Sequence, residues 1–157
     1  MLRRLIAAIL FGAILASGCA AVQNMGTTGP MATVLQRGTN DCAVAVLAML
    51  AGTSYERADA VRKTVKEPLG NGLFAIEMAL IAQRLGERVR YVSAQDFNHV
   101  HMEGILVVYL PGTITSTHAV YVKGGYVYDP RDAWPVPYVL ASTTLWERIA
   151  YFLEKVQ

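Results

Sequence analysis

Hydrophobic and polar positions in the first half of the chain follow the period of helices. Residues 42–51 are apolar on every side until Gly52, the pattern of a helix that is buried all round. Asp41 directly precedes this run and is expected to cap it. Two more helices are predicted at 54–65 and 73–85. Three helices therefore open the domain.

The second of these helices has a start signal of its own. Thr53 is followed three residues later by Glu56, which is the spacing of a capping box. Thr144 and Glu147 repeat this spacing near the end of the chain, so a last helix is expected to run to about residue 156.

Between these helices the pattern is that of strands. The runs 88–93 and 105–110 predict two strands, and the glycine pair at 124–125 predicts a tight turn that joins strands 118–122 and 126–129. Helices, then an antiparallel sheet, then a helix make an α+β fold.

The predicted hairpin brings a histidine and a carboxylate together. With the two glycines as its loop, Lys123 pairs with Tyr126, and side chains alternate in direction along each strand. His118 and Asp129 then share a face as diagonal neighbours, with Cα atoms about 7–8 Å apart. The two side chains are within reach of one another.

Cys42 lies in the first turn of the buried helix, where unpaired N–H groups and the helix dipole favour a thiolate. Its thiol is either reactive or a small hydrophobic group that fills the core. A histidine oriented by a carboxylate beside a thiol is the arrangement of nucleophilic catalysis, which makes Cys42, His118 and Asp129 the candidate catalytic residues. Gln36, six residues before Cys42, is the candidate oxyanion donor.

The first eighteen residues have the pattern of a secretory signal. Arg3 and Arg4 precede an uncharged run at 5–16 that is too short to span a bilayer, and small residues precede Cys19. The sequence LASGC resembles a bacterial lipoprotein signal, which implies a lipidated Cys19 and an exported protein anchored to the cell membrane or outer membrane. The domain is expected in the periplasm. An ordinary signal peptide cut nearby is the alternative.

Three segments follow from this interpretation: a signal peptide at 1–18, a lipidated tether at 19–32 and a single domain at 33–157. The tether is rich in Gly and Thr and shows no period. If Cys19 carries lipid, Cys42 has no partner in the chain, although exported proteins normally pair their cysteines.

The charge and the residue composition of the chain exclude some classes of function. The chain has 157 residues, a net charge of only +2 and no basic tract, which excludes nucleic-acid binding by charge. His99 and His101 could form a zinc site together with His118, but no second ligand pair accompanies them, so no metal is expected. No cofactor is expected either. The expected partners are a peptide or protein substrate and, through the lipid, a membrane.

The segment from Gln36 through Asp41 and Cys42, with HAVYVKGGYVYDP at 118–130, resembles the papain-like cysteine peptidases. The likeness is to the family that removes double-glycine leaders from bacteriocins and to its free-standing relatives. It implies a papain-like fold, with a buried N-terminal nucleophile helix packed on a small antiparallel sheet. It also implies cysteine peptidase activity, with the oxyanion held by Gln36. The run AVA at 43–45 departs from the Gly and Pro that usually follow the cysteine.

The first hypothesis is a membrane-anchored cysteine peptidase that hydrolyses peptide bonds in the cell envelope. Two alternatives stay open. An NlpC-type peptidoglycan hydrolase also pairs a cysteine at a helix start with a strand histidine, but it leaves Gln36 without a role. A catalytically inactive relative would keep the fold and bind a peptide or protein with an idle thiol.

Overall fold

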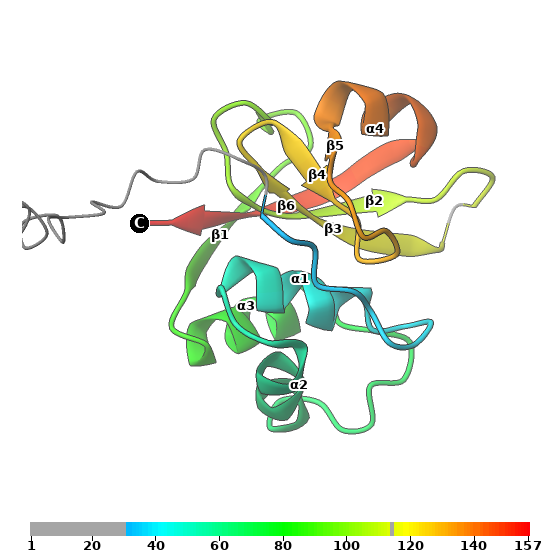
Figure 1. Ribbon diagram of the computed structural model, residues 1–157. Helices are drawn as coiled ribbons and strands as arrows, with labels where there is room; N and C mark the ends of the chain where they lie inside the picture. The colour runs from blue at the N-terminus through cyan, green and yellow to red at the C-terminus, as the bar shows by residue number, and fades with distance from the viewer. Residues whose placement is uncertain (1–30, 114) are drawn as a thin grey trace, which may run out of the picture.

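The computed structural model describes residues 31–113 and 115–157 (Figure 1). The predicted signal peptide and Cys19, with most of the tether, lie outside the described residues. Among the helices of the described part, none is long and apolar enough to cross a membrane.

A six-stranded antiparallel sheet forms the frame of the domain, in the order β1-β6-β2-β3-β4-β5. Three helices cover one face of this sheet, and a fourth packs on the other (Figure 1). The helices are α1 (Cys42–Leu50), α2 (Tyr55–Lys63), α3 (Ala75–Arg84) and α4 (Tyr138–Thr144). The strands are β1 (Arg88–Val92), β2 (Gly104–Tyr109), β3 (Thr117–Lys123), β4 (Tyr126–Tyr128), β5 (Val136–Pro137) and β6 (Arg148–Val156). The predicted α+β class is confirmed.

The central strands are buried on both faces. In β2, Ile105 and Val107 pack into the core that α1 and α3 share with the sheet. Leu106 and Val108 alternate with them and pack into a second core, which Ala141 of α4 helps to close. The sequence of such a strand is a continuous apolar run, because neither of its faces is in contact with water.

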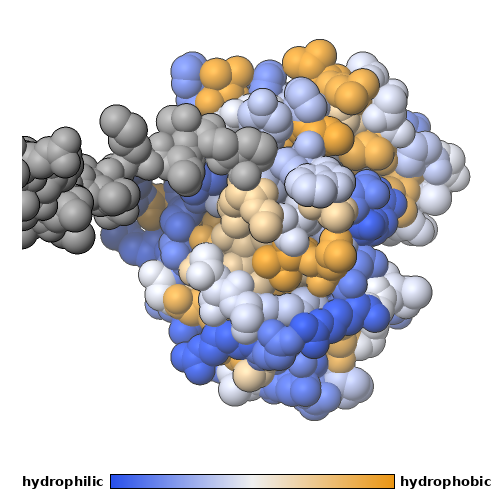
Figure 2. Space-filling model, in the orientation of Figure 1, coloured by the Kyte–Doolittle hydropathy of each residue, from blue (hydrophilic) through white to orange (hydrophobic). Residues whose placement is uncertain are grey.

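Helix α1 lies at the centre of the helical layer, as its sequence predicts. All of its residues after Cys42 are buried, and it packs on β3, α2 and α3. Helix α2, in contrast, buries only Ala58 and Arg62 and presents a hydrophilic surface (Figure 2). The nucleophile candidate thus opens a helix that is fixed by packing on every side.

The predicted last helix is wrong. Residues 148–156 form β6, which lies between β1 and β2 and pairs with both. Phe152 and Leu153 face opposite cores, so residues 149–153 form a short continuous apolar run, which periodicity cannot distinguish from a buried helix. Thr144 ends α4 instead of capping a helix, and Glu147 accepts a hydrogen bond from the backbone N–H of Gly112 at 3.3 Å.

Two local predictions can be compared residue by residue. The hairpin register is confirmed, because Lys123 pairs with Tyr126 across the loop. The capping box at Thr53 is wrong by one residue: Ser54 is the N-cap of α2, and its hydroxyl accepts the N–H of Arg57 at 3.2 Å.

Replacing Gly104 by alanine is expected to lower the free energy of unfolding by about 1–3 kcal/mol, the usual cost of overpacking. A Cβ atom at this position would lie 2.1 Å from the backbone oxygen of Leu153 in β6, so the two strands would have to separate. Urea denaturation measures the change. Gly38→Ala is the control, because its nearest neighbour would lie at 3.7 Å. A Gly104→Ala protein as stable as the wild type would contradict this close approach.

Candidate active site

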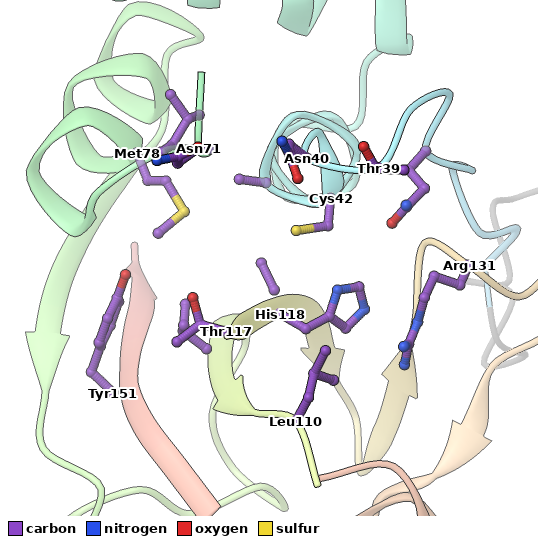
Figure 3. A pocket seen from close by; sticks show the side chains of 16 residues that line it. Thr39, Asn40, Cys42, Asn71, Met78, Leu110, Thr117, His118, Arg131 and Tyr151 are labelled. Carbon is purple, nitrogen blue, oxygen red and sulfur yellow. The ribbon is translucent and has the colours of Figure 1, made fainter. Parts of the chain in front are cut away.

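Three side chains from separate elements meet at one end of the sheet. Cys42 opens α1, His118 lies near the start of β3, and Asp129 directly follows β4. Nε2 of His118 lies 2.8 Å from Oδ1 of Asp129. Cys42 faces His118 across the pocket (Figure 3), near enough for His118 to lower the pKa of the thiol. The structure therefore brings the three candidate catalytic residues together.

The surroundings of Cys42 and His118 shift their pKa values in opposite directions. Burial raises the pKa of Cys42, but the hydrogen bond and positive charge of His118, with backbone N–H groups, outweigh it and lower the pKa below that of an ordinary thiol. Burial lowers the pKa of His118, but Asp129 and Cys42 outweigh it and raise the pKa. Both shifts favour a thiolate–imidazolium pair.

Asp129 is held in its ionised form. It is only 2% exposed, and burial alone would raise its pKa, but hydrogen bonds from His118 and Arg131 hold the pKa well below the usual range of a carboxyl group. A carboxylate that accepts from Nε2 leaves Nδ1 of His118 as the nitrogen available to the thiol.

Arg131 is a site residue to which sequence reasoning assigned no role. Its Nη2 lies 2.6 Å from Oδ2 of Asp129, its Nε lies 3.1 Å from Oδ1, and its backbone N–H also donates to Oδ1. The side chain is 39% exposed and lines the pocket. The sequence does contain a signal for Arg131. Side chains alternate in direction along a strand, so a residue two positions after Asp129 lies on the same face of the sheet as Asp129.

Asp41 does not cap α1 with its side chain, which corrects the prediction from sequence. Its carboxylate accepts the backbone N–H groups of Arg37 and Gly38 at about 3.0 Å and the hydroxyl of Tyr55 at 2.5 Å. Asp41 therefore binds the loop that carries Gln36 to the start of α1.

Gln36 lines the same pocket as Cys42 and His118. Its backbone N–H donates to the carbonyl of Pro130 at 2.9 Å, which ties the loop to the segment after Asp129. Its Nε2 donates to the carbonyl of Gly38 at 2.8 Å. Because an amide nitrogen carries two protons, one proton remains for another acceptor.

The pocket has a volume of about 250 Å³ and opens beside Cys42 (Figure 3). Its walls come from the loop before α1, the start of α1, the loop before α3 and α3 itself. Strands β2, β3 and β6 and the segment after β4 complete them. The lining residues are Gln36, Thr39, Asn40, Cys42, Ala43, Asn71, Gly72, Leu73, Met78, Val107, Leu110, Thr117, His118, Ala119, Arg131 and Tyr151.

The other two histidines lie elsewhere. The ring of His99 stacks on Tyr138, with centroids 4.1 Å apart, and His101 is exposed. Among residues 31–113 and 115–157, no three His, Cys, Asp or Glu side chains gather as they would around a metal ion.

Solved structures of peptidase domains share this architecture. The peptidase domain of Streptococcus ComA, a bi-functional ABC transporter involved in a quorum sensing pathway, is 23% identical with a TM-score of 0.52, over 78% of this chain and 97% of that one. The peptidase domain of Streptococcus mutans ComA is 18% identical with a TM-score of 0.51, over 80% of this chain and 98% of that one. The chain has the papain-like fold of these peptidase domains.

A third structure with the papain-like fold is a double glycine motif protease from an AMS/PCAT transporter, solved in complex with its leader peptide. It is 17% identical with a TM-score of 0.50, over 80% of this chain and 93% of that one. The sequence matches no protein-family model and no curated protein. The papain-like fold predicted from the sequence, a buried nucleophile helix on an antiparallel sheet, is confirmed.

Proposed function

We propose that this protein is a cysteine peptidase that hydrolyses peptide bonds in the cell envelope. The observation that carries the proposal is the placement of Cys42 opposite His118, which is hydrogen-bonded to Asp129, on the wall of an open pocket (Figure 3). A thiol that only filled the core would not need a histidine with a raised pKa beside it. The peptidase domains that share the fold support the same reaction class.

In the proposed mechanism, the thiolate of Cys42 attacks the carbonyl carbon of the scissile bond, and a C–S bond forms. The remaining amide proton of Gln36 and the backbone N–H of Cys42, which has no partner within the helix, stabilise the oxyanion. His118 gives its proton to the leaving amine as the C–N bond breaks. It then takes a proton from water, the hydroxide attacks the thioester, and the C–S bond breaks to restore the thiolate.

The sequence AVA after Cys42 is compatible with this mechanism. Val44 and Ala45 are fully buried in the helix core, and Ala43 contributes only a methyl group to the pocket. The departure from the Gly and Pro of the resembling family therefore changes the core packing of α1, while Cys42 and His118 still line the same pocket.

The proposed function is tested with the full-length chain in detergent micelles. Cleavage of a peptide library is measured beside release of fragments from purified peptidoglycan, with Cys42→Ala as the control for both. We expect cleavage of peptides that is lost in Cys42→Ala. Activity on peptidoglycan alone would identify the NlpC-type alternative. Binding that survives Cys42→Ala, without cleavage of either substrate, would identify an inactive binding protein.

We further propose that Cys19 carries the lipid that holds the domain at a membrane. Eleven residues lie between Cys19 and Met31, so the tether spans at most about 40 Å. Labelling with palmitate and membrane fractionation test this: the wild type is expected in the membrane fraction with label, and Cys19→Ser without either. An unlabelled wild-type protein would indicate an ordinary signal peptide.

Replacing Arg131 by methionine is expected to lower kcat about 10- to 100-fold, because a hydrogen bond to a charged group contributes about 1.5–3 kcal/mol. Arg131 positions Asp129 and places a positive charge near Cys42. Loss of that charge raises the pKa values of both Cys42 and His118, so the pH profile of activity moves to higher pH. Arg131→Lys keeps the charge but not the planar fork. Arg131→Lys should therefore restore the pH profile of activity but not the wild-type kcat. A pH profile that is unshifted in Arg131→Met would contradict the role of Arg131.

A further inference from the structure

Helix α4, on the face of the sheet away from α1, and the loop before it present large apolar side chains to solvent. Trp134 is 81% exposed, and Val139 and Leu140 of α4 are 68% and 55% exposed. Hydrophobic residues gather over α4 at the top of Figure 2. We call Trp134, Val139 and Leu140 the α4 surface. They lie within seven consecutive residues, so even an extended chain would hold them within about 20 Å of one another.

The chain around the α4 surface carries no charge. Residues 133–146 contain no Asp, Glu, Lys, Arg or His. The exposed apolar residues of α3 differ in this respect, because the ammonium group of Lys66 lies 4.8 Å from the ring centre of Phe74, and Glu77 directly follows Ile76. A neutral surface loses little when it leaves water, whereas a charged one loses its hydration. The α4 surface is therefore the exposed apolar region better suited to an apolar environment.

The hydroxyl groups of α4 find acceptors within the helix itself. Ser142 donates to the carbonyl of Val139 at 3.0 Å, and Thr143 and Thr144 donate to the carbonyl of Leu140 at 2.8 and 3.0 Å. Serine and threonine often bond to their own helix in this way. Because these protons already have acceptors, the helix can enter a medium without hydrogen-bonding partners at a small cost.

The proposed lipid at Cys19 places a bilayer within reach of the α4 surface. The backbone N–H of Met31 donates to the hydroxyl of Tyr128 at the end of β4, β4 pairs with β5, and β5 leads directly into α4. A tether of at most about 40 Å keeps this part of the domain close to the membrane. At such a high local concentration, even a small surface with a weak affinity for lipid is occupied.

We propose that the α4 surface rests on the lipid bilayer, with Trp134 at the level of the headgroups and Val139 and Leu140 against the acyl chains. Tryptophan is enriched at this depth, because its ring is apolar and its N–H is polar. Arg131 lines the pocket and lies three residues before Trp134, so the contact brings the pocket close to the bilayer. Substrate would then be met at the membrane surface. This inference rests on the proposed lipid anchor and, for the substrate, on the proposed peptidase function.

The residues that flank the charge-free segment predict that the contact does not need anionic lipid. Arg131 and Asp132 precede it, and Glu147 and Arg148 follow it, so each flank carries one basic and one acidic residue. Binding driven by apolar side chains is not screened by salt. We therefore expect the same contact on vesicles of neutral phosphatidylcholine at low and at high salt. A contact that is lost at high salt would contradict the apolar origin.

The fluorescence of Trp134 tests the contact, because the chain has two tryptophans and the other, Trp146, is only 7% exposed. Full-length protein is reconstituted in phosphatidylcholine vesicles with or without bromine atoms on the acyl chains, which quench a tryptophan that they touch. We expect bromine to lower the emission by about a third to a half, since one of two tryptophans lies at the bilayer. Trp134→Phe should lose most of this quenching. Equal emission from the two kinds of vesicle would overturn the proposal.

A matched pair of variants tests whether α4 itself touches lipid. Leu140→Asp should lower the quenching of Trp134 at least twofold, because a carboxylate resists leaving water. Ile76→Asp is the control, since Ile76 is 77% exposed on α3, away from the α4 surface. It should leave the quenching unchanged. Equal alkylation of Cys42 in the three proteins shows that the fold is intact. Unchanged quenching in Leu140→Asp would reject the contact of α4 with lipid.

Palmitate labelling of the same samples separates this inference from the lipid anchor. Labelled protein without quenching would reject the α4 surface and keep the anchor. Quenching in unlabelled protein would support the surface and reject the anchor. Protein that is neither labelled nor bound to vesicles would reject both. A dimer that Leu140→Asp dissociates, found together with unquenched Trp134, would assign the surface to a second copy of the chain and overturn the membrane contact.

Discussion

Replacing His118 by alanine is expected to slow alkylation of Cys42 by iodoacetamide at least tenfold near neutral pH. In the wild type, His118 lowers the pKa of Cys42 against the opposing effect of burial. Without the imidazole, the effect of burial dominates, so the pKa of Cys42 rises to that of an ordinary thiol or higher. Each unit of that rise reduces the thiolate fraction about tenfold at a pH below the pKa. The rate is measured from about pH 5 to pH 10.

Two comparisons make this result specific. His101→Ala removes an exposed histidine outside the pocket and should leave the alkylation profile unchanged. Above the raised pKa, the alkylation rate of His118→Ala should recover to the wild-type value, because the sulfur remains equally accessible. A profile that is the same in His118→Ala and wild type would reject the catalytic pair.

Replacing Gln36 by alanine is expected to lower kcat by about 10²–10³ with little change in KM, which is the usual effect of losing one oxyanion donor. Two hydrogen bonds hold the residue in place, from its backbone to Pro130 and from its side chain to Gly38. The backbone bond persists in the alanine variant, so the loop stays attached. Steady-state kinetics on the best peptide measure the change.

Arg37→Ala is the control for the Gln36 variant. Arg37 lies on the same loop, but its guanidinium points to Glu56 at the surface and does not line the pocket. Its replacement should change kcat less than about twofold, since exposed ion pairs contribute little. If kcat of Gln36→Ala also fell less than threefold, Gln36 would only hold the loop in place and would not stabilise the oxyanion.

The two ends of α1 favour opposite charges. Cys42 lies at the N-terminus, where the helix dipole favours negative charge. At the other end, the ammonium group of Lys155 donates to the carbonyl of Leu50 at 3.0 Å and lies 2.9 Å from the carboxylate of Glu87. Lys155 therefore lies where the dipole favours a cation and Cys42 lies where it favours a thiolate, on a helix fixed by its apolar surroundings.

Local patterns were sufficient for the parts of this protein that depend on neighbouring residues. The all-round apolar run predicted α1, and the glycine pair predicted the hairpin register. The register in turn predicted that His118 and Asp129 meet, since alternation along a strand fixes which side chains share a face. Each of these inferences uses spacing within about a dozen residues.

Partners distant in the sequence were decided only by the tertiary structure. Residues 148–156 are a strand because β1 and β2 each need a partner along one edge, and no periodicity in an apolar run shows this. The carboxylate of Asp41 accepts hydrogen bonds from the preceding loop and does not cap the helix, because two backbone N–H groups of that loop and the hydroxyl of Tyr55 lie around it.

The sequence by itself identified the candidate residues for the proposed chemistry: a thiol at a helix start, a histidine with a carboxylate on a hairpin, and an amide six residues upstream. Tertiary structure decided how they are held and what they face. Arg131 donates hydrogen bonds to Asp129, and the carbonyl of Pro130 accepts one from the backbone of Gln36. Helix α3 and strand β6 bring Met78 and Tyr151 to one end of the pocket. The physical reason is that a side chain's chemistry is local, whereas its surroundings are set by segments that only folding brings together.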